Sequence, residues 1–433
     1  MIRKGLIRAS VPFVVKETTM FGADFEKKAA ELGWKKAAMG GNLLLRHINT
    51  SFTKNAVCIE KQLSDKDYQV PVKLDDREVR YPFTITQVQV CCFDTGIGFF
   101  TFHIPYEGPV EEEVVVNSCS ALHASVPHAN KARQREILCG EKETCLSCLA
   151  EKYLTALLDK AYTLFATQHD TALRRINVFS AILCEQDSAE NGKANHEKSC
   201  YRLAQAYDTR DDDLKIDREK DIHWAQEYIR WSFSKRGCAA VANLTGKKST
   251  DFFLENIWLN SVKTNYFYLH LMVLHEKLAS YYYLNQVADD PDMSKWKINQ
   301  KSLLDFNSKY IFTVVSDEAL VQGVYKKMKT AANADEVYAE MQEQLRRMFD
   351  YAQIKANEAT ESTNDLLNLI SVIVGVVCSV SVIFECISMF TEWGWIFGFD
   401  CVRNGLFTGA ILLEVALFVG VLIMVLTAGK RKK

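Results

Sequence analysis

Two long apolar runs near the C-terminal end of the chain constrain its fold more than any other feature. The first, Leu366–Phe384, carries no charged residue and continues beyond Glu385 to Phe390. The second, Gly405–Ala428, is interrupted only by Glu414. A helix of about 20 apolar residues can cross the hydrocarbon core of a bilayer. The sequence therefore predicts two transmembrane helices, over 366–390 and 405–428.

The residues around these runs predict an orientation. The loop 391–404 holds several large aromatic side chains, which favour the headgroup level of a membrane. The chain then ends in a basic tail, 429–433, and basic residues mark the cytoplasmic side of a span. Because two spans return the chain to the side it left, we expect a multi-pass protein of an inner or plasma membrane with both termini in the cytoplasm.

The part of the chain before residue 366 is long enough for one large or two ordinary domains, because the whole chain has 433 residues. We expect an α/β sensor domain over 1–240, a helical region over 241–330 and the stalk part of a long helix over 331–365. The expected fold class is thus a mixed sheet plus helices (α+β), followed by a stalk helix and two transmembrane helices. A net charge of −2 gives no general attraction for nucleic acid.

Short β-branched and alternating segments predict a sheet in the first part of the chain. The clearest is a hairpin, in which Phe83–Phe93 alternates apolar and polar residues, Asp94-Thr95-Gly96 forms the turn, and Gly98–Pro105 returns. Asn42–Ile48 and Val110–Asn117 are further predicted strands, and Phe25–Leu32 is a predicted helix.

The cysteines could in principle form disulfides or bind a metal ion. The basic N-terminal residues lack the continuous apolar core of a signal peptide, so we expect the 13 cysteines to be in a reducing compartment and not in a disulfide framework. Cys139, Cys145 and Cys148 with His128 form a weak candidate zinc site, since thiolates and imidazole suit tetrahedral zinc. The alternative is that these are reduced cysteines in a loop before a helix.

The absence of proline after Pro291 allows one very long helix after a break near Ala331–Asp335. This helix carries a seam of apolar and small residues at alternating steps of four and three, as in a coiled coil. The seam consists of Met341, Leu345, Met348, Ala352, Ala356, Ala359, Thr363, Leu366, Ile370, Ile373 and Val377. A lone helix does not need such a seam, so we predict packing against copies of the same helix.

A second stripe on this helix is polar, and polar groups at membrane depth are costly unless they face protein or water. We therefore predict that the stripe lines a pore; the alternative is hydrogen bonding to neighbouring helices. Glu392 and Asp400 would lie at the outer mouth, and rings of acidic side chains attract cations. The predicted pore-lining residues are Asn357, Asn364, Asn368, Ser371, Gly375, Cys378 and Glu385.

This arrangement resembles the CorA-type divalent-cation channels, most closely through NEATESTNDLLNLISVIVGVV at Asn357–Val377. The resemblance implies a homopentamer with the first spans around the pore. One feature departs from the family. The Gly-Met-Asn tripeptide that follows the first span is absent, and Ser388–Phe397 reads SMFTEWGWIF there. Ion selectivity therefore cannot be carried over.

The segments YFYLHLMVLHEKLASYYYLN, at Tyr266–Asn285, and GIGFFTFHIPYE, at Gly96–Glu107, resemble a divergent CorA-like branch associated with type III CRISPR systems of prokaryotes. This resemblance implies an antiviral membrane effector gated by a second messenger, S-adenosylmethionine joined to AMP. It implies no tightly bound cofactor; the conjugate and a divalent cation are the expected ligands, and the resemblance does not locate the ligand site.

Three alternative functions are also compatible with the sequence. The first is a constitutive divalent-cation transporter of the magnesium type. The second is a membrane-anchored enzyme, although the chain has no Gly-rich phosphate loop, no His-x-x-x-His helix and no Gly-x-Ser-x-Gly elbow. The third is a scaffold anchored by a helical hairpin. We expect a protein that is not an enzyme and binds no nucleic acid directly.

Overall fold

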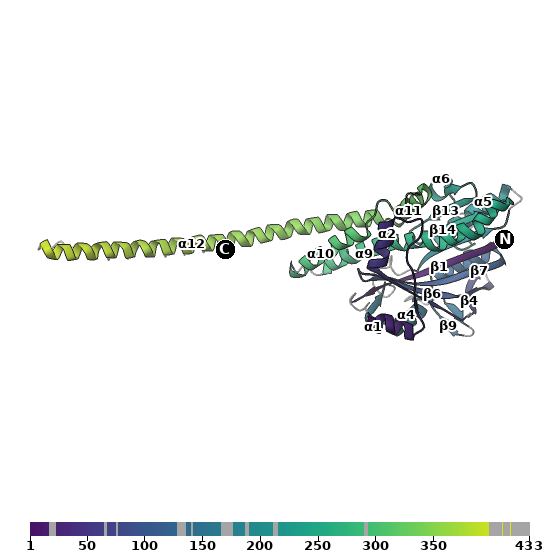
Figure 1. Ribbon diagram of the computed structural model, residues 1–433, viewed down its shortest axis with the longest axis horizontal. Helices are drawn as coiled ribbons and strands as arrows, with labels where there is room; N and C mark the ends of the chain where they lie inside the picture. The colour runs from purple at the N-terminus through teal and green to yellow at the C-terminus, as the bar shows by residue number, and fades with distance from the viewer. Residues whose placement is uncertain are drawn as a thin grey trace. The chain divides into compact units, whose positions relative to one another are not determined.

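The computed structural model describes residues 1–16, 23–64, 67–74, 77–127, 136–139, 142–165, 176–186, 190–210, 215–289 and 293–397, together with Gly409 and Ala416. The chain divides into two compact units, Met1–Gln344 and Leu345–Lys433. The first unit contains both sheets and most of the helices (Figure 1).

The strands of the described residues are short, apart from two of 14 residues each near the middle of the main sheet. They are β1 Ile2–Val15, β2 Lys35–Lys36, β3 Ala56–Gln62, β4 Asp67–Leu74, β5 Arg77–Thr84, β6 Gln87–Phe93, β7 Ile97–Val110, β8 Ile137–Cys139, β9 Lys142–Thr144, β10 Tyr162–Leu164, β11 Asn177–Cys184, β12 His223–Gln226, β13 Ile229–Phe233 and β14 Gly237–Asn243.

The longest of the described helices, α12, is also the last. They are α1 Ala23–Glu31, α2 Arg46–Asn55, α3 Glu112–His123, α4 Leu146–Leu158, α5 Glu190–Gln205, α6 Arg218–Asp221, α7 Lys248–Phe252, α8 Leu259–Ser261, α9 Phe267–Asp289, α10 Met293–Tyr310, α11 Ala319–Ala332 and α12 Ala334–Phe397. Two π-helical segments, η4 Phe253–Trp258 and η5 Val262–Tyr266, join α7, α8 and α9 into one continuous helical run.

The main sheet has the strand order β12-β13-β14-β11-β1-β7-β6-β3-β2, with β10 also paired to β1. Its strand pairs are antiparallel except β11 and β14, which run parallel. A second sheet has the order β5-β4-β8-β9. The parallel pair requires a crossover connection, and α5 lies on that connection and packs on β13 and β14.

Helices cover both faces of the main sheet. Alternate side chains of β1, such as Ile7 and Phe13, join one large core with residues of α1, α3, α4 and α5. The opposite face meets α9, where the Arg8 guanidinium lies 4.1 Å from the ring centre of Phe267 and Phe179 contacts His270. Figure 1 shows α1 and α4 on one side of the strands and α9 and α11 on the other.

The predicted hairpin is confirmed as β6 and β7, and Phe25–Leu32 corresponds to α1. Two predicted strands are wrong. Val110–Asn117 mostly belongs to α3, because Glu112 and Glu113 in its first turn favour a helix start and Val115 and Val116 bury against the sheet. Asn42–Ile48 leads into α2, where Ile48 is buried.

Helix α12 runs unbroken from Ala334 to Phe397, as predicted, and Asn333 in the left-handed conformation separates it from α11. Across the described residues, however, no helix has both the length and the apolar content needed to cross a bilayer. The predicted fold class with two C-terminal transmembrane helices is therefore wrong. The predicted multi-pass inner-membrane location is wrong for the same reason.

The physical reason concerns polarity and not length. The long helix itself was predicted, and α12 has 64 residues. Along the predicted first span it carries exposed polar side chains at Asn368, Ser371 and Glu385. Polar groups are costly at membrane depth unless they face protein or water. The second predicted span, 405–428, lies outside the described residues apart from Gly409 and Ala416.

Candidate functional site

A candidate ligand-binding site in the first unit lies beside the tight turn between β13 and β14. Ser234 Oγ accepts hydrogen bonds from the backbone N–H groups of Arg236 (2.9 Å) and Gly237 (3.2 Å), and donates one to the Ala204 carbonyl (2.6 Å). A Cβ on Gly237 would lie 2.2 Å from the Val178 carbonyl oxygen, so the close approach of β14 to β11 requires glycine. This turn holds Lys235 and Arg236 in fixed positions.

Arg236 is anchored on the C-terminal end of α5. Its Nη1 donates to the Gln205 carbonyl at 3.0 Å, and its guanidinium lies 5.1 Å from the ring centre of Tyr207. A guanidinium fixed in this way retains unused N–H donors. It can therefore bind a phosphate or carboxylate group without a large loss of side-chain entropy.

A cavity of about 590 Å³ lies beside this turn. Lys235 and Arg236 line it together with Lys277 and Tyr281, which are one turn apart on α9. The volume falls in the range of small-molecule sites, about 300–1,000 Å³. The cavity is thus large enough for a nucleotide.

The charge of this wall favours an anion. Burial lowers the pKa of Lys277, and the positive charge of Lys235 lowers it further. Within the described part of the chain, neither lysine lies within salt-bridge distance of a carboxylate. An anionic ligand would relieve the repulsion between the two ammonium groups, and clustered, partly desolvated cations of this kind are typical of ligand sites.

The first turns of α12 line the same cavity through Glu336, Val337 and Glu340, and Asn333, directly before the helix, lines it too. Glu336 and Glu340 are four residues apart and therefore share one face of the helix. The cavity consequently presents both cations and carboxylates. A ligand bound there would contact the β13–β14 turn, α9 and α12 together.

A buried ionic network connects the same helices. Lys329 of α11 lies 2.8 Å from Glu276 Oε1 of α9 and 2.7 Å from Asp335 Oδ1 of α12. Glu276 directly precedes Lys277 in the sequence. Burial raises the pKa of Glu276 to about 7, although the attraction of Lys329 opposes this shift. The network therefore couples the cavity helix α9 to the start of α12.

A second cavity, of about 550 Å³, shares Lys235 and Arg236 with the first. Lys220, His223 and Lys327 also line it. Burial lowers the pKa of His223, and Lys327 lowers it further. The two cavities thus lie next to one another, with the two basic residues of the β13–β14 turn between them.

The predicted pore-lining residues all belong to α12. Each of the seven is an exposed residue in the single chain, and all but Gly375 expose a side chain: Asn357, Asn364, Asn368, Ser371, Gly375, Cys378 and Glu385. Of the predicted outer-mouth residues, Glu392 lies in the last turns of α12, where the side chain is not described, and Asp400 lies outside the described residues. The predicted seam between copies of the helix started at Met341, but Met341 is already buried within the first unit of the single chain.

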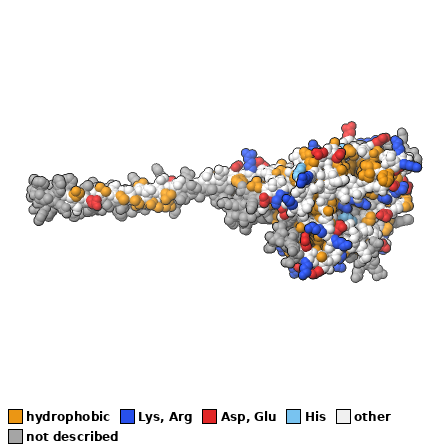
Figure 2. Space-filling view, in the orientation of Figure 1, with side chains coloured by type: hydrophobic (Ala, Val, Ile, Leu, Met, Phe, Trp, Pro, Cys, Tyr) orange, Lys and Arg blue, Asp and Glu red, His pale blue; other side chains and the backbone are white. Residues whose placement is uncertain are grey.

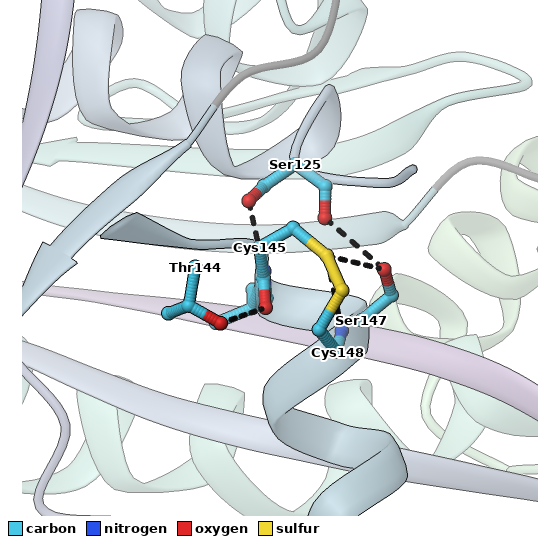
Figure 3. Close-up of a disulfide and its surroundings, with 6 residues drawn as sticks. Ser125, Thr144, Cys145, Ser147 and Cys148 are labelled. Atoms are coloured by element: carbon cyan, nitrogen blue, oxygen red, sulfur yellow. Dashed lines mark hydrogen bonds between the residues drawn. A yellow bond between two sulfur atoms is a disulfide. The ribbon is translucent and has the colours of Figure 1, made fainter. Parts of the chain in front are cut away.

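The cysteine cluster differs from the prediction. Cys145 and Cys148 are joined in a disulfide at the start of α4, so the interpretation of this pair as reduced cysteines is wrong (Figure 3). The Cys145 side chain caps the helix by accepting from the Cys148 N–H, and Ser125 Oγ accepts from the Leu146 N–H. Helix geometry brings the first and fourth residues of this segment together. Two sulfur atoms bonded to each other cannot ligate zinc, and His128 lies outside the described residues.

Sequence reasoning missed the cavity, because its residues come from positions 123 to 340 and meet only after folding. The one local signal was Ser234-Lys235-Arg236-Gly237, a basic turn between two apolar segments. Comparison of the chain with family models, with curated proteins and with solved structures finds no match in any of the three. The CorA-like assignment therefore stays a resemblance carried by the segments quoted above.

Proposed function

We propose that the chain is a ligand-controlled effector, in which an anionic nucleotide binds the cavity beside the β13–β14 turn and changes the packing at the start of α12. One observation carries this proposal. The cavity that holds Lys235, Arg236 and Lys277 is also lined by Glu336 and Glu340 of α12. A ligand cannot fill it without contacting the long helix.

The ligand proposed is the conjugate of S-adenosylmethionine and AMP that the sequence resemblance implies. Its phosphate suits the three cations, and an adenine ring suits stacking on Tyr281. Its sulfonium and amino groups are positive, and Glu336 and Glu340 supply the matching negative charge. A simple mononucleotide would offer these two carboxylates no positively charged group.

Control of α12 follows from unequal binding to two states. A ligand shifts an equilibrium only by the difference between its affinities for the two conformations. In the proposal, the bound state draws α9 and α12 together through Lys277 and Glu336. The Glu276–Lys329–Asp335 network then transmits the change to α11, because its members sit on all three helices.

The proposed active form is a homo-oligomer, and the resemblance favours a pentamer. Large apolar side chains of α12 are exposed in the single chain, among them Leu366 at 58% and Ile370 at 47%. Figure 2 shows hydrophobic side chains along the described part of this helix. Packing copies of α12 against one another would remove this apolar surface from water.

The resemblance also supports a role in antiviral defence, in which the messenger reports infection. The predicted channel activity, and the alternative of constitutive divalent-cation transport, both required spans that the described helices do not provide. Neither is part of the proposal. The effector action is instead assigned to a ligand-dependent change in the assembly of α12.

Calorimetric titration of the full chain with the conjugate tests the binding step. We expect binding to weaken at least about tenfold in Lys277→Ala and to be unchanged in Lys152→Ala, which removes an exposed lysine of α4 away from the cavity. AMP and S-adenosylmethionine alone should each bind more weakly than the conjugate. Equal affinity for the conjugate in both variants would overturn the proposed site.

A further inference from the structure

A second cluster lies on the other side of the core from α9, where three different elements meet. Glu112 is the first residue of α3, Cys184 is the last residue of β11, and His196 lies in α5. Their ligand atoms all lie within 4.8 Å of one another. A carboxylate, a thiol and an imidazole together are the three side-chain types that zinc takes as ligands.

The distances suit a tetrahedral ion. Zinc binds oxygen and nitrogen at about 2.0–2.2 Å and sulfur at about 2.3 Å, so neighbouring ligand atoms of a tetrahedron lie about 3.3–3.7 Å apart. Glu112 Oε1 and His196 Nδ1 are already 3.3 Å apart. The Cys184 sulfur would need to approach by no more than about 1.5 Å, given those bond lengths.

The surroundings also suit a metal site. Cys184 is fully buried, the His196 side chain is 5% exposed, and the Glu112 side chain is 22% exposed. Glu112 therefore gives the cluster a side open to solvent, where a water molecule can be the fourth ligand. Ser199, one turn from His196 on α5, hydrogen-bonds the Glu112 carboxylate and holds it in place.

One charged neighbour sets a limit on affinity. The buried guanidinium of Arg230 interacts with both Glu112 and Cys184. It stabilises negative charge on these two groups, but it also repels a metal cation. We propose that Glu112, Cys184 and His196 form a zinc site that ties the start of α3 and the end of β11 to α5. Binding releases the Cys184 thiol proton to solvent and requires that His196 Nδ1 carry no proton, so that a neutral imidazole would hold its proton on Nε2.

Cobalt(II) is the probe for this site, because a cobalt–thiolate bond gives a charge-transfer absorption that oxygen and nitrogen ligands do not give. The full chain would be treated with chelator, dialysed and titrated with cobalt(II). We expect one tightly held cobalt per chain with the thiolate band, and zinc should displace it. Cys184→Ser should lose the band, whereas Cys119→Ser, a buried cysteine of α3 outside the cluster, should keep it.

A further pair of variants covers failure of Cys184→Ser to fold. Glu112→Gln alters the partly exposed ligand, and Ser199→Ala alters only its hydrogen-bond partner. Loss of a group that orients a ligand weakens metal binding about 10–100-fold. We therefore expect cobalt to bind at least about tenfold more weakly in both, with the thiolate band still present at saturation. Absence of a retained cobalt in the unaltered chain, or a thiolate band that survives in folded Cys184→Ser, would overturn the site.

Discussion

The ammonium group of Lys329 lies 2.8 Å from a carboxylate oxygen of Glu276, and both side chains are almost completely shielded from solvent. The desolvation cost of such a pair is large, so it is weak evidence for added stability. The position of the pair matters for coupling between helices. Lys329 also contacts Asp335, so the network joins α9, α11 and the start of α12 next to the basic cavity. The pair also gives two predictions about stability.

The first concerns pH. The ordinary pKa of glutamate is 4.5, and burial raises that of Glu276 to about 7. Between these values the folded chain holds a proton that the unfolded chain releases, so this group's contribution to stability falls as pH rises from 4.5 to about 7. Urea unfolding across this window should show a flatter profile in Glu276→Gln. The exposed Glu151→Gln should keep the original slope, and an equal slope in all three proteins would contradict the prediction.

The second concerns removal of one partner. Lys329→Met leaves Glu276 buried without its cation, and breaking a buried pair in this way costs about 3–5 kcal/mol. The double variant Lys329→Met with Glu276→Gln should recover a large part of that loss, because no charge is then left buried. Chemical denaturation of the four proteins gives the coupling energy. A double variant no more stable than Lys329→Met would show that the charge is not the cause.

The β13–β14 turn provides a third prediction. Gly237→Ala would place a Cβ 2.2 Å from the Val178 carbonyl oxygen, so β14 must shift and Lys235 and Arg236 must move with it. We expect a loss of about 1–3 kcal/mol of stability, as for other overpacked sites, together with weaker ligand binding. Gly323→Ala, in α11, would place a Cβ at ordinary contact distance, 4.0 Å, from His223 Nε2, and should instead stabilise the chain by about 0.5–1 kcal/mol. Thermal melts of the two variants should therefore shift in opposite directions.

Self-association of α12 gives a fourth prediction. Ile370→Asp places a charge on the exposed apolar surface of the helix and should dissociate the oligomer. Leu304→Asp, which changes an equally exposed apolar side chain on α10, should leave the assembly intact. Native mass spectrometry of the full chain measures both. A monomeric unaltered chain, or an Ile370→Asp oligomer of unchanged size, would contradict self-association through α12.

The sequence predicted elements whose pattern is local. Gln87–Phe93 and Ile97–Val110 alternate clearly around an Asp94-Thr95-Gly96 turn, and proline-free sequence predicted α12. Val110–Asn117 was predicted as a strand because valines favour strands. The segment mostly forms α3 instead, because acidic residues in the first turn and burial against the sheet stabilise a helix there. The apolar content of 366–390 predicted a helix correctly, but no helix of the described residues has the length and apolar content of a membrane span.

The cavity beside the β13–β14 turn could not be predicted from the sequence, for a different reason. Lys235, Lys277 and Glu336 are each unremarkable in their own segments, where a lone charged residue is most often solvated. Their significance depends on one cavity that the sheet, α9 and α12 form together. The zinc ligands Glu112, Cys184 and His196 are likewise separated by more than one element, and no short spacing links them. Cys145 and Cys148 had a recognisable spacing, but their chemistry is a disulfide.

Amide hydrogen exchange of the full chain, with and without the S-adenosylmethionine–AMP conjugate, tests control of α12 most directly. We expect slower exchange with the conjugate in the β13–β14 turn, in α9 around Lys277 and in the first turns of α12 around Glu336. Lys277→Ala should remove this protection, while Lys152→Ala should retain it. Protection confined to other parts of the chain, or unchanged exchange in α12 despite measurable binding, would contradict control of α12 by a ligand in this cavity.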